Sequence, residues 1–356
     1  MKAAPAISVV LPVFNAEAYV REAVESILGQ SFTDFELIII NDGSTDGSGA
    51  ILRELAARDP RIDLTERPNA GLVSALNDGI ERAQASLIAR MDADDVAMPE
   101  RLALQYARMV ASPRLAVLGS FIRLVDATGK VIRIADYPVT EADTAHFLEF
   151  GCPLAHPTVM MRRDAVLAAG GYRRAFAHCE DYDLWFRISE GGFGIGNLPL
   201  PLLNYRIHGE NVSSIHREAQ ELGSILARLC HRARKVGLRD PAEGVERIHA
   251  GLIELIPLHL RQDLEAALFV TRHSYLSLAG RAELASAWAQ YRRLSRQTRV
   301  EGVMCDFLIR LAYGAVRNSY FSLAARASLD AIRIHPRASL GTVLRKLNAR
   351  FGRNVA

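Results

Sequence analysis

The chain has 356 residues, a length that suits two average domains better than one. Apolar residues make up 49% and charged residues 23%, which is ordinary for a globular protein and excludes a low-complexity chain. No apolar run reaches the ~18 residues of a membrane-spanning helix, and the start of the chain does not have the pattern of a secretory signal. We therefore expect a cytoplasmic protein. Its four cysteines, without C-x-x-C spacing, should be free thiols in a reducing compartment: Cys152, Cys179, Cys230 and Cys305.

The net charge of +3 conceals an asymmetry between the two parts of the chain. Residues 1–216 carry a net charge of −8 and residues 217–356 a net charge of +11. A basic half of this kind suits an anionic surface or partner. Nucleic acid is a poor candidate for that partner, because aromatic stacking residues are not interleaved with the arginines.

In chain order, residues 7–91 alternate between strand-like and helix-like segments. Strands are predicted at 7–14, 35–40, 61–66 and 86–91, and helices at 16–30, 47–58 and 70–84. The strands are almost continuously apolar, which is typical of a parallel sheet covered by helices on both faces. Further elements are predicted as strands at 115–121 and 158–162, a hairpin of 122–125 with 130–134, and a helix at 181–190.

Beyond residue 216 the pattern becomes helical and rich in Ala, Leu and Arg. Helices are predicted at 217–236, 242–256, 261–270, 281–296, 302–315, 319–333 and 338–350. The sequence thus divides into an α/β domain at 1–216 and an all-α domain at 217–356. Residues 337–356 hold five cations and no acid beside an apolar stripe. This pattern fits a helix lying on an anionic membrane, or one whose stripe docks on its neighbours.

Acidic residues follow two of the predicted strands. Asp92, Asp94 and Asp95 come directly after the strand at 86–91, and Asp42 lies in the turn 41–46 after the second strand. Ligands bind at the carboxyl ends of strands in such sheets, and crowded carboxylates favour a divalent cation such as Mg²⁺ or Mn²⁺. The alternative interpretation is that both segments are solvated turns that cap the helices after them.

An ordered set of motifs resembles the family 2 inverting glycosyltransferases, which have a GT-A fold. The motifs are residues 10–15, 41–46, 90–95, 156–158, 180–181 and 205–208, and the resemblance covers about residues 7–215. It implies the transfer of one sugar from a nucleotide-sugar donor, a UDP-hexose or UDP-N-acetylhexosamine, to a saccharide or lipid-linked acceptor in bacterial surface-polysaccharide synthesis. Asn41 replaces an Asp of many members, and the Q-x-x-R-W motif of processive synthases is absent. A single addition is therefore expected rather than polymerisation.

The resemblance also implies residue roles. Asp181 matches the catalytic base, and Asp94 and His208 match positions that hold Mn²⁺ or Mg²⁺. The nucleotide-binding positions are Pro12, Glu17, Asp42, Asn77, Arg90 and Asp92. The acceptor-side positions are Glu180, His156 and Trp185.

Two other functions remain open on the sequence. A nucleotidyltransferase also places acids at strand ends, although it would want a Gly-rich loop where this chain has Pro12–Asn15. A non-catalytic scaffold would bind a partner through its helical half. At the level of single motifs, Glu180 and Asp181 also suit the start of a helix, where acids are favoured, and His156 before a proline suits a turn.

Overall fold

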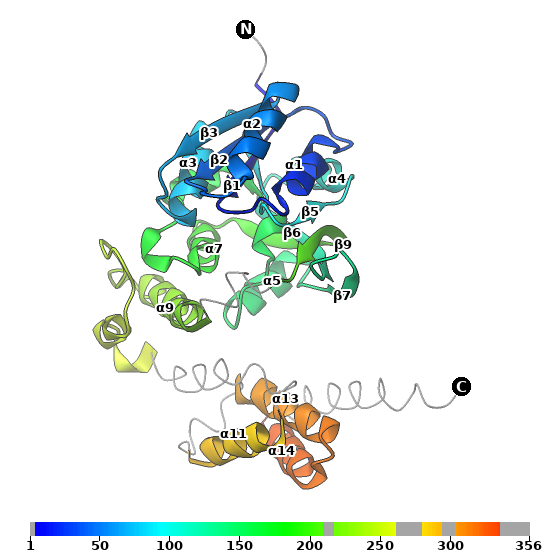
Figure 1. Cartoon of the computed structure of the whole chain (residues 1–356). Helices are drawn as coiled ribbons and strands as arrows, with labels where there is room; N and C mark the ends of the chain where they lie inside the picture. The colour runs from blue at the N-terminus through cyan, green and yellow to red at the C-terminus, as the bar shows by residue number, and fades with distance from the viewer. Residues whose placement is uncertain (1–3, 209–216, 261–279, 294–302, 335–356) are drawn as a thin grey trace. The chain divides into compact units, whose positions relative to one another are not determined.

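The computed structural model describes residues 4–208, 217–260, 280–293 and 303–334 (Figure 1). Contacts divide the chain into two compact units, Met1–Ala250 and Gly251–Ala356. The compositional change at 216 and this division at 250 fall at different places, because the helix after residue 216 packs within the first unit. Within the described ranges, no helix is both long enough and apolar enough to cross a membrane.

The first four main strands form a parallel sheet in the order β3-β2-β1-β4. They are β1 (Ile7–Val13), β2 (Phe35–Asp42), β3 (Ile62–Arg67) and β4 (Leu87–Arg90). The connecting helices are α1 (Val20–Leu28), α2 (Ser48–Arg58) and α3 (Leu72–Arg82). This confirms the predicted alternation.

Both faces of this sheet are covered, as the apolar strands require. Val9 and Leu11 of β1 belong to a core cluster that also includes residues of α1 and α2. The next side chain along the strand, Val10, faces α3 instead. A Cβ added to Gly79 of α3 would lie 2.4 Å from a methyl of Val10, so this helix approaches the sheet only because it has glycine there.

The sheet continues as β4-β8-β6-β9-β5 and becomes mixed. Its further strands are β5 (Val96–Ala97), β6 (Leu115–Val125), β7 (Val131–Ala135), β8 (Met160–Arg162) and β9 (Gly194–Arg206). β8 is antiparallel to β4 and β6, whereas β9 runs parallel to β6. β7 forms the predicted antiparallel hairpin with β6. The other helices of this part are α4 (Arg101–Ala111), α5 (Glu141–Leu148) and α6 (Arg163–Ala168).

Several segments differ from the prediction. The helix expected at 16–30 begins at Val20, because the backbone N–H groups of residues 15–17 are bonded to side chains of the β2–α2 loop and of Ser48, the first residue of α2. β9 was not predicted, since its glycines and prolines interrupt the apolar pattern. The helix expected at 242–256 is absent: Pro241 and Gly244 (φ +72°) form a turn, and only Ala250–Leu255 is helical, as a 3-10 helix.

Two helices complete the first unit, α7 (Glu180–Glu190) and α9 (Arg217–Lys235), and they pack against each other (Figure 1). The second unit contains α11 (Arg281–Arg293), α13 (Val303–Arg317) and α14 (Phe321–Ile334) around a small apolar core. The predicted helices at 261–270 and 338–350 lie outside the described residues, as does the membrane interpretation of 337–356.

Candidate active site

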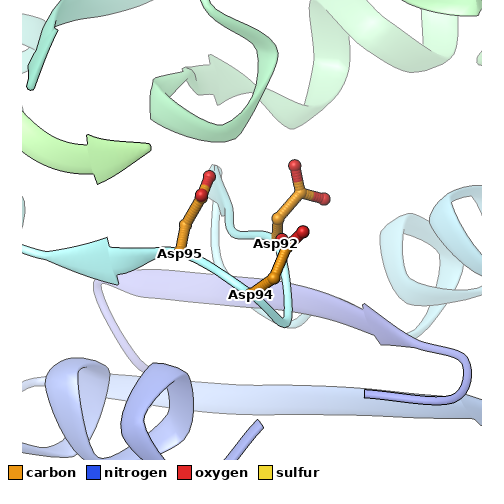
Figure 2. A group of neighbouring side chains, drawn as sticks. All are labelled: Asp92, Asp94 and Asp95. Atoms are coloured by element: carbon orange, nitrogen blue, oxygen red, sulfur yellow. The ribbon is translucent and has the colours of Figure 1, made fainter. Parts of the chain in front are cut away.

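Three carboxylates project from the loop between β4 and β5 (Figure 2). One oxygen from each of Asp92, Asp94 and Asp95 lies within 4.8 Å of the others. The loop exists because β4 ends at Arg90 and the chain turns before entering β5. Asp94 contacts His208, whose Nε2 lies 2.9 Å from the Asp94 Oδ2. The structure therefore brings together the two residues that the resemblance assigned to a metal.

The charges in this loop are only partly balanced. Burial raises the pKa of Asp92, Arg90 opposes this through an ion pair, and Asp94 raises it further. Burial and the same two aspartates raise the pKa of Asp95 well above its ordinary value. Beneath the loop, Arg101 is fully buried and donates to the carbonyl of Arg90 at 2.6 Å, and burial lowers its pKa to about 9.

The residues present fit a divalent cation. Oδ1 of Asp95 accepts a hydrogen bond from the Arg206 N–H at 2.9 Å, but its buried Oδ2 has no hydrogen-bond partner among the described residues. A buried carboxylate oxygen without a partner is costly, and a hard cation coordinated by oxygen would satisfy it. The sequence run contained Asp95, but nothing in it singled this residue out as the one whose oxygen lacks a partner.

The loop between β4 and β5, residues 91–95, is called the acid loop below. A cavity of about 760 Å³ opens on one side of it. It is lined by residues of four segments: 12–19, Asp42 with Asp46, residues near 69–75, and Asp92–Asp94 with His208. Of the residues predicted to bind nucleotide, Pro12, Glu17, Asp42 and Asp92 line this cavity. Tyr19 stacks on His208 at 5.2 Å between ring centroids, and the Arg206 guanidinium lies over the Tyr19 ring at 4.8 Å.

Hydrogen bonds join two loops at this cavity, the β1–α1 loop and the β2–α2 loop. Asn15 accepts from the Thr45 N–H at 2.8 Å and donates its own N–H to the Ser44 hydroxyl at 3.0 Å. Glu17 donates its N–H to Asp46 at 3.0 Å, and its carboxylate accepts from the Gly47 N–H at 2.5 Å. Glu17 thus bonds the backbone of the residue that precedes α2 while it lines the cavity.

Asp42 is buried at the floor of the same cavity. Its Oδ1 accepts from Arg67 Nε at 2.8 Å and from the Ala70 N–H at 3.1 Å, and its Oδ2 accepts from the Gly71 N–H at 2.8 Å. Asp42 therefore fixes the loop that leads into α3. A carboxylate oxygen can accept two hydrogen bonds, so Oδ2 retains capacity for a ligand donor.

A second cavity, of about 380 Å³, meets the first at Leu72, Asp92 and Asp94. Its wall includes Arg90, His156, Glu180 and Asp181, together with residues of β6, β7 and β9 and Gln220 of α9. The structure thus joins the predicted base and two predicted acceptor-side residues in one cavity beside the acid loop.

The two carboxylates at the start of α7 differ in their surroundings. Asp181 accepts from the Tyr182 N–H at 2.7 Å and lies 3.6 Å from the Cys152 thiol, and burial raises its pKa. Burial and the charge of Asp181 raise the pKa of Glu180 to about 7. These acids also begin a helix, as the alternative interpretation expected, but both line the cavity as well.

The structure places two other predicted residues away from the cavity walls. Asn77 lines neither of the two cavities, because its amide is bonded in both directions to the backbone of Tyr172, at 2.8 and 2.9 Å. Trp185 is fully buried beyond His156, with 6.0 Å between ring centroids, and also lines neither cavity.

Comparisons with known proteins agree with this geometry. Residues 8–171 match the family model "Glycosyl transferase family 2". The chain is 38% identical over 208 residues to the O-antigen biosynthesis glycosyltransferase WbnJ of Escherichia coli, covering 58% of this chain and 81% of that protein. The chain belongs to glycosyltransferase family 2. It is also 32% identical to the amylovoran biosynthesis glycosyltransferase AmsE of Erwinia amylovora, over 58% of this chain and 78% of that protein.

Two solved structures share the fold of this family 2 glycosyltransferase. S. aureus TarS 1–349 in complex with UDP-GlcNAc aligns with a TM-score of 0.52 at 16% identity, covering 97% of this chain and 92% of that one. The mannosyltransferase PcManGT from Pyrobaculum calidifontis, in complex with GDP-Man and Mn²⁺, aligns with a TM-score of 0.50 at 18% identity, covering 90% and 88%. The expected GT-A fold is confirmed.

Sequence reasoning missed several residues of the glycosyltransferase site. Tyr172, Cys152 and Gln220 belong to no motif, and only the fold brings them to the second cavity or its lining residues. Arg101 also belongs to no motif, and no local pattern predicts its burial beneath a cluster of acids.

Proposed function

We propose that this glycosyltransferase moves one sugar from a nucleoside diphosphate sugar, a UDP-hexose or UDP-N-acetylhexosamine, to a saccharide or lipid-linked saccharide, with inversion at the anomeric carbon. One observation carries the proposal. Two cavities meet at Asp92 and Asp94, and a buried carboxylate, Asp181, lines the smaller cavity. The nucleoside would occupy the larger cavity, the diphosphate would lie at the junction, and the sugar would extend into the smaller one.

The donor would be held by groups that the geometry leaves available. Asp42 would accept from the base through Oδ2, in a cavity whose wall includes Pro12 and Glu17. Asp92 would contact the ribose. Arg90 is buried and paired with Asp92, so it can add positive charge near the diphosphate.

Asp94, Asp95 and His208 are the residues that would hold Mn²⁺ or Mg²⁺. When bound, such an ion offsets the charge that develops on the departing diphosphate. Aspartate oxygens suit both ions, and His208 favours Mn²⁺ over Mg²⁺ because imidazole suits transition metals.

In the transfer step, Asp181 would take the proton of the acceptor hydroxyl while that oxygen attacks C1 of the donor sugar. The new bond forms on the face opposite the leaving group, the C1–oxygen bond to the diphosphate breaks, and the nucleoside diphosphate departs with the electron pair. Burial raises the pKa of Asp181 and so makes it a stronger base than an exposed aspartate. A single base suffices for inversion.

Similarity to the O-antigen and amylovoran glycosyltransferases supports a role in bacterial surface-polysaccharide synthesis. A lipid-linked acceptor would place the enzyme on the inner face of the cytoplasmic membrane. Deleting 337–356 should then reduce co-sedimentation with vesicles containing anionic lipid, with no change in nucleotide affinity. Equal sedimentation of the full and shortened chains would remove this segment from the proposal.

The deciding experiment is calorimetric titration of UDP into the full chain, in Mn²⁺ and then in EDTA. We expect binding that depends on the metal, and the variant Asp94→Ala should bind UDP in Mn²⁺ only as weakly as the wild type does in EDTA. Asp63→Ala is the matched control, because Asp63 is an exposed carboxylate on β3. Binding of GDP or dTDP instead of UDP would change the donor. Binding of none of the three would favour the scaffold function.

A further inference from the structure

One buried oxygen of Glu180, a residue that lines the smaller cavity, has no hydrogen-bond partner among the described residues. The Glu180 side chain is only 5% exposed and lines this cavity. Within the described part of the chain, no group bonds its Oε2. An acceptor left unpaired in a buried position costs free energy, so this oxygen calls for a donor from a ligand. On the same wall, Arg90 Nε is also buried without a partner among the described residues.

His156 lies beside the other oxygen of Glu180. Its Nδ1 is 4.0 Å from Glu180 Oε1, and its Nε2 is 2.8 Å from the Tyr172 hydroxyl. Burial and the charge of Arg90 lower the pKa of His156 well below its ordinary value, so the ring is neutral and carries one proton. Which nitrogen carries it depends on the hydroxyl.

The Tyr172 hydroxyl favours one of the two tautomers. It has two possible acceptors, His156 Nε2 at 2.8 Å and the Met161 sulfur at 3.8 Å. A thioether is a weak acceptor and an imidazole nitrogen a good one. The hydroxyl therefore donates to Nε2, and the proton of His156 resides on Nδ1, facing Glu180.

Tyr172 is itself fixed in place. Asn77 donates to its carbonyl at 2.8 Å and accepts from its N–H at 2.9 Å. Asn77 belongs to α3, which packs on β1 and β2. The position of the hydroxyl is thus set by the nucleotide-side half of the sheet.

We propose that Tyr172 and His156 are positioning residues that orient Glu180 so that its Oε2 accepts a hydrogen bond from a hydroxyl of the donor sugar. The inference rests on the proposed function, because only a nucleoside diphosphate at Asp92 and Asp94 brings a sugar into this cavity. A sugar hydroxyl suits this oxygen, since a hydroxyl can donate to a carboxylate.

The tautomer can be tested without any substrate. In ¹⁵N-labelled full-length chain, the ring nitrogens of His156 should give a protonated Nδ1 and an unprotonated Nε2. Tyr172→Phe should mix the two forms, whereas Tyr182→Phe, which removes another buried hydroxyl, should leave the signals unchanged. A protonated Nε2 in the wild type would overturn the proposal.

The role of His156 and Glu180 is tested by the affinity that the sugar adds, which is the affinity for a UDP-sugar relative to that for UDP. UDP is compared with UDP-glucose, UDP-galactose and UDP-N-acetylglucosamine, and the sugar nucleotide that the wild type binds best is kept. Glu180→Gln and His156→Gln should each lose about tenfold in its affinity, the scale of one hydrogen bond to a charged group, with UDP affinity unchanged. In His156→Asn the amide nitrogen replaces Nδ1, so this variant should retain most of the affinity that the sugar adds.

The outcomes separate the two proposals. If UDP and the UDP-sugars bind, but no variant changes the affinity of the UDP-sugar relative to that of UDP, the positioning role is wrong and the proposed function stands. A His156→Gln variant that binds the sugar nucleotide better than His156→Asn does would also overturn the role. If neither UDP nor any of the three UDP-sugars binds, the UDP-sugar donor is wrong and the positioning role falls with it, whereas binding of GDP or dTDP would keep glycosyl transfer with another donor.

Discussion

Buried carboxylates occur in two regions of the first compact unit, and their pKa values are shifted in opposite directions in the two regions. At the contact between α7 and α9, Asp240 pairs with Arg173 and Arg234, which lower its pKa to about 2 although burial acts to raise it. At the cavity, burial and a neighbouring carboxylate raise the pKa of Glu180 to about 7. Helix α7 contributes to both regions: Glu180 and Asp181 line the cavity, and Asp183 pairs with Arg173 and Arg187.

The difference teaches how to separate structure from function among buried acids. Where each carboxylate has a cation, as Asp183 has Arg173 and Arg187, the charges hold the fold together. Where carboxylates face one another or an open cavity, as Asp95 and Glu180 do, the fold alone does not satisfy them. Such groups mark the places that a ligand completes.

The largest expected effect is on the cavity side. Asp181→Asn removes the proposed base and should lower kcat by roughly 10²–10⁴-fold, with nucleotide affinity nearly unchanged. In the wild type, the acid limb of the kcat/KM profile should lie above the ordinary range of an aspartate, because burial raises the pKa of Asp181. Loss of UDP binding in this variant would instead assign Asp181 to the structure.

In the region where the carboxylates have cation partners, Asp183→Asn should destabilise the fold. Asp183 is fully buried between two guanidinium groups; removing its charge takes away the carboxylate that pairs with Arg187 and leaves Arg173 with Asp240 alone. We expect a loss of about 3–5 kcal/mol in the free energy of unfolding, measured by urea denaturation. The same change at Asp63, an exposed residue that pairs with Arg82 at 3.6 Å, should cost below about 0.5 kcal/mol. Equal effects at the two sites would break the comparison.

The acid loop should respond in the opposite direction. Asp95→Asn removes a charge whose ionised form the fold disfavours, so in metal-free buffer the free energy of unfolding should rise by about 1 kcal/mol. The wild type should be stabilised by Mn²⁺ more than this variant is. A variant that is less stable than the wild type without metal would show that Asp95 is already satisfied.

The smallest expected effect is a pH dependence of stability that comes from the contact between α7 and α9. His231 of α9 contacts Glu190 at 2.6 Å and Glu149 at 3.5 Å; burial acts to lower its pKa, but these carboxylates raise it above its ordinary value. The stabilisation is therefore complete below the ordinary histidine pKa and is lost as pH rises through the raised one. His231→Gln should lose below about 1 kcal/mol at acid pH and less at alkaline pH. Equal losses at both would contradict this.

Much of the nucleotide half was readable from the sequence, because its strands are continuous apolar runs and its acids follow them directly. Local sequence patterns were sufficient to predict β1 and β2. β9 could not be recognised, since Pro199 and Pro201 fall in it, and the sheet tolerates Pro201 only where its register with β6 shifts. α5 was not predicted either, although the sequence has a signal for its start, because the Thr140 side chain caps the N–H of Asp143.

The grouping of the candidate-site residues followed from the motifs where a motif names the residue, and it did not where only the fold brings a residue in. Asp92, Asp94 and His208 meet as expected from their motifs. Asn77 was expected at the nucleotide, yet it holds Tyr172, a contact between residues 95 positions apart that no local pattern encodes. Partnerships of this length depend on tertiary packing.

The two joined loops at the larger cavity also bear on the thermodynamics of binding. Asn15 has a positive φ of 48° and is held there by Ser44 and Thr45. A nucleotide that enters meets a wall whose backbone has already lost its conformational entropy. The association therefore forgoes part of the ordering cost that a mobile loop would impose. Severing these links, for example by Asn15→Ala, should appear in calorimetry as a less favourable entropy of UDP binding.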